Sequence, residues 1–438
     1  MPSRVNEEDI CIDEKHPVAV KVYEPGQHPS PYQFYSSELA VFNIEERDVL
    51  IMDFIDGFHI NPDLNDTTEL RKLTFAQAAD IAWQLIIGLN HFHYNNISGP
   101  AMVHGDVKGD NIKVRIKEVV VDGIKRYKID TFYLDCDYVK LIQDNPQRSQ
   151  GTAEHLPIEV LDGYYTEAGD FFSLSPVLLS LFGAHNPLRT ILQFRNSHLH
   201  MEVPDLVRHY QDIGFCTDGL FEHFDEKPEQ TITQLLEQFI GQMSEKNKAN
   251  RPAPDVILEF FTALRQLTLV EKSSKERDIY LLRLYIAAHH EDWLNEKKYQ
   301  NLFLQLDEHL KVRLILLMNL KQSIHLYQLM RDNKEAKIVI DKVRQNIANH
   351  LEIYSRSLTK PSLLRSFFLH PVKQKEIQWL LNCYKTNDSS EYYSSSNDKL
   401  RQRLLSCSEK ELSPLIIILS ECFTKPQELA TLPNQIQI

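Results

Sequence analysis

The sequence lacks most features that mark secreted, membrane-spanning or metal-stapled proteins. Its six cysteines are scattered along 438 residues, and no two form a CxxC pair. Neither a disulfide framework nor a zinc module is expected, and free thiols fit a reducing compartment. No apolar run approaches the roughly 20 residues that a spanning helix needs, and the N-terminus MPSRVNEEDI is acidic, unlike a secretory signal. We expect a cytoplasmic protein with no transmembrane segment.

Positive charge is also scarce relative to negative charge. The formal net charge is −13 at pH 7, which argues against a nucleic-acid partner held by general phosphate attraction. The apolar share of 42% is ample for packed cores, and the length allows two or three domains at about 150 residues each. We therefore expect a soluble protein of more than one domain, and the acidic balance favours basic partners.

Apolar periodicity divides the chain into a strand-containing first half and a helical second half. Alternating and β-branched residues predict strands over 17–23 and 48–57, and a hairpin of strands 112–121 and 127–134 around the turn VDGIK. Helical spacing predicts helices over 36–42 and 74–95, with Thr74 as the N-cap of the second. From about 274 onward one apolar helical stripe follows another.

The stretch VHGDVKGDN, residues 103–111, concentrates charge in a turn-rich run. Taken alone it is typical of a solvated surface loop. Its spacing, however, resembles H-R-D-x-K-x-x-N, the catalytic loop of protein kinases. The resemblance implies that Asp106 orients the attacking hydroxyl, that Lys108 stabilises charge beside the transferred phosphoryl group, and that Asn111 holds Mg²⁺.

Upstream, VAVK at 18–21 resembles the V-A-I-K strand of the same family. The resemblance implies that Lys21 binds the α- and β-phosphates of ATP and that Glu38, on the helix predicted over 36–42, is its ion-pair partner. The run 52–54 resembles the segment that meets adenine. The implied ATP-binding set is Lys21, Glu38, Ala19, Met52, Asp53 and Phe54.

Downstream, YLDCD at 133–137 occupies the place of the D-F-G motif. Asp135 is the implied second Mg²⁺ ligand, and Asp137 remains an alternative. GTAEHLPIE at 151–159 aligns without a gap with the end of a kinase activation segment, G-T-x-x-Y-x-A-P-E. The residues implied to have structural or substrate-positioning roles are Thr152, Glu159, Asp170 and Arg251, with Glu159 and Arg251 forming a buried pair.

These motifs occur in family order, so the chain resembles eukaryotic-type protein kinases over roughly residues 10–268. The resemblance implies a two-lobed α+β kinase fold with a trimmed N-lobe at 1–56, a C-lobe at 57–270 and an all-α domain at 271–438. It also implies transfer of the γ-phosphoryl group of Mg-ATP to a protein substrate. Lys108 together with Thr152 favours Ser or Thr as the acceptor.

Three departures from the family pattern bear on regulation. Residues 1–20 contain no glycine, so the Gly-rich loop is missing there, and Lys113 stands where an apolar residue usually meets adenine. Gly105 replaces the arginine that reads an activation-loop phosphate. We expect control by a partner protein instead. The trimmed motifs motivate the hypothesis of a bacterial effector kinase that is secreted into the host-cell cytosol and activated by a host protein.

Two other functions remain open on the sequence. A pseudokinase, a binding scaffold without turnover, is suggested by the missing glycines and the altered D-F-G motif. An aminoglycoside- or choline-type small-molecule kinase is suggested by the H-G-D triplet and the D-x-D pair at 135–137. Lys108 and the GTAEHLPIE run are protein-kinase features that those enzymes lack.

Overall fold

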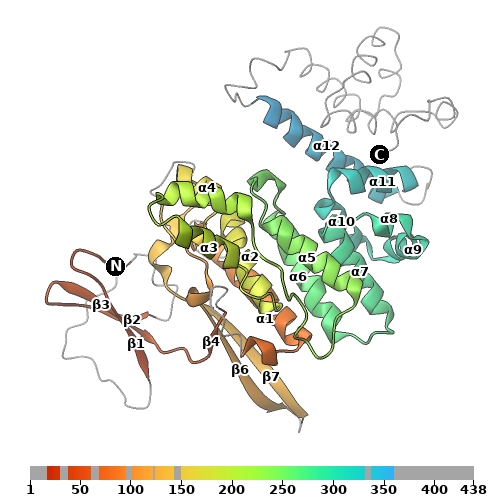
Figure 1. Ribbon diagram of the computed structural model, residues 1–438. Helices are drawn as coiled ribbons and strands as arrows, with labels where there is room; N and C mark the ends of the chain where they lie inside the picture. Colours follow the sequence, from red (N-terminus) through yellow and green to blue (C-terminus); the bar gives the residue numbers. More distant parts are fainter. Residues whose placement is uncertain are drawn as a thin grey trace. The chain divides into compact units, whose positions relative to one another are not determined.

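The computed structural model describes residues 17–29, 38–60, 69–94, 101–121, 124–142, 149–330 and 337–359. The chain divides into two compact units, residues 1–284 and 285–438, which are described separately below (Figure 1). Within the described ranges, no helix combines the length and the apolar character needed to cross a bilayer.

The first sheet of unit one is antiparallel and contains β1 (Val18–Val22), β2 (Glu38–Ile44) and β3 (Arg47–Asp53), in the order β1-β3-β2. The helix predicted over 36–42 is wrong for its described residues, because 38–42 belong to β2. The turn residues Glu45 and Glu46 both have positive φ and fold β2 back onto β3. Pairing with β3 satisfies the backbone of 38–44, which overrides the local helical pattern.

A second sheet is built around a long ribbon of β6 (Ile112–Val121) and β7 (Ile124–Tyr133), with β4 (Phe58–His59) on the outer side of β6. These strands confirm the predicted hairpin. The short strands β5 (Met102–Val103) and β8 (Lys140–Leu141) pair separately. One 3-10 turn, η4 (Gly109–Asn111), links the catalytic-loop stretch to β6.

Helix α1 (Phe75–Tyr94) supports the ribbon and confirms the helix predicted over 74–95. It begins with a reciprocal cap: the backbone N–H of Gln77 donates to Thr74 Oγ1 at 3.2 Å, and the N–H of Thr74 donates to Gln77 Oε1 at 2.9 Å. Its apolar face is fully buried, and the hydroxyl of Tyr133 in β7 donates to the Leu85 carbonyl at 2.9 Å. The ribbon is thereby fixed against the helical core.

Helix α2 (Glu167–Leu181) is buried along nearly its whole length and packs against α1, and further helices follow it in unit one. They are α3 (Arg189–Ser197), α4 (Val203–Ile213), α5 (Gln230–Met243), α6 (Pro254–Leu269) and α7 (Lys275–Ala287), whose last residues enter unit two. Stacked rings of Phe239 and Phe260, 3.9 Å between centroids, join α5 to α6. The interior is close-packed and rigid enough to hold a site in place.

The described part of unit two is helical. It contains α8 (Asp292–Asn295), α9 (Lys297–Gln305), α10 (Glu308–Leu317), α11 (Leu320–Met330) and α12 (Lys337–Thr359). The buried amide of Asn346 donates to the carbonyls of Ile315 at 2.7 Å and Met318 at 3.1 Å, which satisfies the C-terminal end of α10. The part of the expected helical domain at 360–438 lies outside the described residues.

Candidate active site

The carboxylate of Asp106 is the centre of the site. It lies in the loop between β5 and η4 and is only 4% exposed. One oxygen accepts hydrogen bonds from the backbone N–H and the hydroxyl of Thr152, both at 2.8 Å. The other accepts from the Asn111 amide at 3.0 Å, and Lys108 Nζ lies 3.4 Å from it. Lys108 also donates to Thr152 Oγ1 at 3.1 Å, so the predicted residues Asp106, Lys108, Asn111 and Thr152 form one contact group.

The carboxylate of Asp170 binds the backbone of this loop. Its carboxylate accepts hydrogen bonds from the backbone N–H groups of His104 at 2.7 Å and Gly105 at 3.0 Å. It lies in the first turn of α2, where the helix dipole favours a negative charge. A carboxylate shared by two successive amides fixes the direction in which Asp106 leaves the loop.

His93 is a further member of this support that the sequence analysis did not single out. It is fully buried, and its Nε2 lies 2.9 Å from Asp170 Oδ2. The available signal was its position four residues after Leu89 on the apolar face of α1, since a polar residue on a core-facing stripe needs a buried partner.

Gly105 has a conformation that other residues rarely adopt. Its φ is +77°, and a Cβ atom there would lie 2.5 Å from the carbonyl oxygen of Tyr138. This crowding explains why position 105 is a glycine. The arginine of the family pattern would not fit here without a shift of the backbone.

Lys21 in β1 contacts two carboxylates that follow β7. Its Nζ lies 2.7 Å from Asp135 Oδ1 and 2.5 Å from Asp137 Oδ2. The hydroxyl of Tyr23 donates to the other oxygen of Asp137 at 2.7 Å. Burial lowers the pKa of Lys21, but the hydrogen bonds to Asp135 and Asp137 outweigh it and raise the pKa above its usual value. The lysine is therefore firmly cationic at neutral pH.

Glu38 was expected to lie on a helix. It lies instead in strand β2, opposite Met52 of β3. Met52 also lies opposite Ala19 of β1, so three of the residues predicted to bind ATP are neighbours in one sheet. Lys21 finds its described carboxylate partners in Asp135 and Asp137.

The residues after β3 meet the start of the ribbon. Phe54 is 49% exposed and directly follows Asp53. Lys113 Nζ donates to the Ile55 carbonyl at 2.8 Å and lies 5.1 Å from the centre of the Phe54 ring. The connecting segment therefore supplies the Lys113 ammonium group with a carbonyl acceptor and an aromatic ring.

Glu159 and Arg251 form a buried two-pronged ion pair. Arg251 donates to the two Glu159 oxygens at 2.6 and 3.1 Å and stacks over Phe172 at 4.7 Å. The pair joins the segment after Thr152 to the one before α6, two parts of the chain 92 residues apart.

Comparison with known proteins identifies the family. The family model described as "Protein kinase domain" matches residues 15–261, more than half of the chain. The chain belongs to the protein kinase family. The predicted fold class, an α+β kinase fold followed by a helical region, is confirmed, and the chain is a kinase, a transferase that uses ATP and a divalent metal as the family does.

Among solved structures, one match is titled "Structure of the Cydia pomonella Granulovirus kinase, PK-1". It has 18% identity, a TM-score of 0.40, and covers 56% of this chain and 85% of that chain. No match was found among curated proteins.

The donor set fits the metal of a kinase site. Leu134 N–H donates to the Asn111 carbonyl at 2.7 Å, so Asn111 and Asp135 lie at the same end of the ribbon. Within the described residues, no cluster of three or more His, Cys, Asp or Glu side chains could hold a metal ion by itself. Mg²⁺ in such sites takes one or two protein oxygen donors plus substrate phosphates and water, and Asn111 with Asp135 supplies that number.

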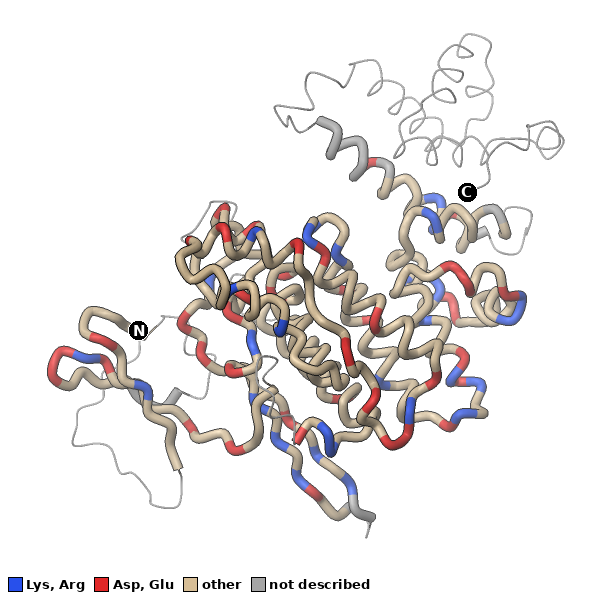
Figure 2. The backbone as a smooth tube through the Cα atoms, in the orientation of Figure 1, with Lys and Arg blue, Asp and Glu red and all other residues tan. Residues whose placement is uncertain are grey.

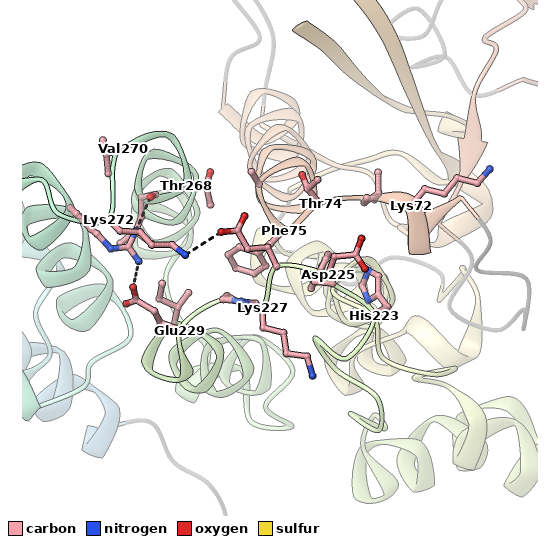
Figure 3. A pocket seen from close by; sticks show the side chains of 18 of the residues that line it. Lys72, Thr74, Phe75, His223, Asp225, Lys227, Glu229, Thr268, Val270 and Lys272 are labelled. Carbon is pink, nitrogen blue, oxygen red and sulfur yellow. Dashed lines mark hydrogen bonds and ion pairs between the residues drawn. The ribbon is translucent and has the colours of Figure 1, made fainter. Parts of the chain in front are cut away.

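Two cavities lie away from Asp106. The one in Figure 3 has a volume of about 450 Å³ and lies between the start of α1 and the segments around Asp225 and Thr268. Its cations Lys272 and Arg277 are paired with Glu226 and Glu229, at 3.2 and 2.8 Å. A second cavity, of about 430 Å³, lies beside β6. None of the predicted site residues lines either cavity.

Proposed function

We propose that this protein is a serine/threonine protein kinase that transfers the γ-phosphoryl group of Mg-ATP to a hydroxyl group of a protein. The observation that carries the proposal is the contact group of Asp106, Lys108, Asn111 and Thr152. Phosphoryl transfer needs little covalent chemistry, and positioning with charge stabilisation supplies most of the catalysis.

Each residue of the group has a role in this proposal. Asp106 accepts the proton of the acceptor hydroxyl and orients its oxygen, since three hydrogen bonds leave its carboxylate no freedom to rotate. Lys108 supplies positive charge within 3.4 Å of that carboxylate. When bound, Mg²⁺ neutralises phosphate charge, and Asn111 and Asp135 would hold it.

The choice of Ser or Thr over Tyr rests on Thr152 and Lys108. Thr152 donates to Asp106 and accepts from Lys108, so both catalytic side chains are tied to the segment that leads to Glu159. This arrangement is the one that the family resemblance associates with Ser/Thr acceptors.

Lys21 is held by Asp137 in this proposal. The carboxylate of Asp137 accepts a hydrogen bond from Lys21 and another from the hydroxyl of Tyr23, while the pairing of Lys21 with Glu38 stays a prediction. Lys21 would then bind the α- and β-phosphates, and Asp135 would exchange the lysine for the metal.

Control by a partner protein accords with Gly105, which offers no guanidinium group to an activation-loop phosphate. The origin of the chain as a bacterial effector activated in a host cell, and the division into 1–56, 57–270 and 271–438, remain predictions.

The test is Mg²⁺-dependent transfer of labelled phosphate from ATP to a generic protein substrate, with and without host-cell extract, followed by identification of the phosphorylated amino acid. Asp106→Asn is expected to abolish transfer. Asp110→Asn is the matched control, because Asp110 is exposed and only four residues away. Phosphotyrosine as the main product would contradict the Ser/Thr proposal.

A pseudokinase is the second candidate, and the double pairing of Lys21 with Asp135 and Asp137 favours it. Both carboxylates neutralise the cation that phosphates would otherwise meet. Nucleotide binding without transfer under any condition, by a folded protein, would replace the enzyme by a binding scaffold. Transfer to an aminoglycoside or choline but to no protein would select the small-molecule kinase.

A further inference from the structure

The β6–β7 ribbon has one strongly basic face. Alternate side chains of a strand point to opposite faces, so the pairing register identifies the residues that share a face. Lys117 lies opposite Lys128 and Arg115 lies opposite Asp130. The cations of this face are Lys113, Arg115, Lys117, Arg126 and Lys128, and its single anion is Asp130. In a chain of net charge −13, this concentration of positive charge is local, and Figure 2 shows it on the projecting hairpin.

The cations near the tip of the ribbon are not neutralised. Lys117 and Arg126 are exposed, and among the described residues neither has an acidic partner. Asp130 is already shared by Arg115 at 3.0 Å and Lys128 at 3.5 Å. Like charges directly opposite each other destabilise a sheet, so Lys117 and Lys128 carry a cost that a bound anion would relieve.

The outer edge of β6 is available to another strand. β4 pairs only with Val114 and Lys113, and in the described part of the chain no strand pairs with β6 on that side from Arg115 onward. Natural edge strands often carry a lysine that discourages accidental pairing with another chain. The ribbon has more than such a lysine: Lys117, Arg126 and Lys128 form a charged surface near its tip, and Lys117 lies directly opposite Lys128.

The cavity of about 430 Å³ lies along this same edge. Its lining includes the apolar side chains Leu73, Val114, Ile116 and Tyr127, and also Arg115 and Lys117 of the basic face. Its acidic lining residues are already paired: Glu69 with Lys72 at 2.6 Å and Asp56 with Arg115 at 3.4 Å. Ile116 and Tyr127 belong to the ribbon face opposite the basic one, because Ile116 alternates with Lys117 and Tyr127 with Lys128.

We propose that the free edge of β6 binds an extended segment of a protein partner in which acidic and apolar residues alternate. A strand added to this edge places successive side chains on opposite faces. Its acidic residues meet Lys117 and Lys128 on the basic face, and its apolar residues enter the cavity beside Ile116. A peptide fits better than a nucleic acid, because the N–H and C=O groups of an open strand edge pair with another peptide backbone.

The test measures binding of fluorescent peptides to the full chain by anisotropy, without nucleotide, so that failure leaves the proposed kinase activity untouched. One peptide alternates glutamate and valine over ten residues, and its comparator has the same composition with the glutamates grouped together. A third peptide carries N-methyl groups on alternate residues, which blocks strand pairing while keeping the charge.

The alternating peptide is expected to bind, and the grouped and N-methylated peptides to bind roughly tenfold more weakly. Lys117→Glu with Lys128→Glu is expected to weaken binding at least about tenfold. Lys227→Glu with Lys297→Glu, the same charge change at two exposed sites elsewhere, is expected to leave binding unchanged.

Three results would overturn the proposal: no binding of the alternating peptide, equal binding of the grouped peptide, or equal loss in the control pair. Preferential binding of a single-stranded oligonucleotide would identify a nucleic-acid surface instead. Since the peptides differ only in order or methylation, their comparison holds even where a variant folds poorly.

Discussion

Lys21 and Asp137 are joined at 2.5 Å, and the other oxygen of Asp137 accepts a hydrogen bond from Tyr23. Tyr23 directly follows β1 and is two residues after Lys21, so both side chains leave the extended backbone on the same side. The carboxylate thus links Lys21 of β1 and Tyr23 directly after it to the segment that follows β7. The D-x-D pair, Asp135 and Asp137, therefore fixes the position of the Lys21 ammonium group.

Replacing Asp137 tests this relationship. Asp137→Asn removes the charge that holds Lys21, so we expect the KM for ATP to rise about tenfold with a smaller change in kcat. Tyr23→Phe should act in the same direction and less strongly, because only one hydrogen bond is lost. Glu38→Gln is the control and should leave both constants unchanged. A larger effect from Glu38→Gln would restore the original assignment, whereas an altered Mg²⁺ requirement in Asp137→Asn would make Asp137 the metal ligand.

Thr152 is expected to act through its hydroxyl group. Thr152→Ala removes the donor to Asp106 and the acceptor of Lys108, and we expect kcat to fall roughly tenfold or more with little change in ATP affinity. Thr152→Ser keeps the hydroxyl and should retain most of the activity. Steady-state rates and a nucleotide-binding titration check both. Equal loss in the two variants would mean that the methyl group, not the hydroxyl, matters.

The pair of Glu159 and Arg251 is expected to stabilise the fold. Both residues are 8% exposed, so removal of one leaves a buried charge without its partner, at a cost of about 3–5 kcal/mol. Glu159→Gln and Arg251→Met should each lower the urea midpoint of unfolding, and the double variant should lose less than the sum of the two. Additive losses would show that the ion pair contributes little beyond packing.

Unit two is expected to lose stability in mild acid through His289. Burial lowers the pKa of His289, although its hydrogen bond with the Leu317 carbonyl, at 3.1 Å, acts in the opposite direction. With a folded pKa below the unfolded value, the unfolded chain binds more protons as the pH falls below about 6.5, so stability decreases there. Thermal melts between pH 7.5 and 5 measure this.

His289→Asn provides the matched variant for that experiment. His289 has a φ of 55°, which asparagine tolerates better than most residues, and its amide can still donate to Leu317. The variant should show a shallower loss of melting temperature with falling pH. An unchanged slope would assign the acid sensitivity to other groups.

Much of the candidate site was predictable because its residues are close in sequence or belong to motifs with fixed geometry. Asp106, Lys108 and Asn111 lie within six residues, so one loop conformation brings them together. The hairpin of β6 and β7 and helix α1 followed from alternation and from helical spacing, which report which face of an element is buried. The contact between Glu159 and Arg251 was expected only through the family resemblance.

Other features could not be read from local pattern. ELAVFNI, residues 38–44, has both helical and strand character, and pairing with β3 decided in favour of a strand. The contact of His93 with Asp170 and that of Tyr23 with Asp137 join residues 77 and 114 positions apart. No short-range periodicity carries information about such distant partners.

Residue order and local burial pattern were enough to predict the family and the balance of strands and helices. The folded chain was needed to show which carboxylates hold Lys21, why position 105 is a glycine and which face of the ribbon is basic. Each of these depends on how distant segments approach one another, and that approach is set by packing of the whole unit rather than by neighbouring residues.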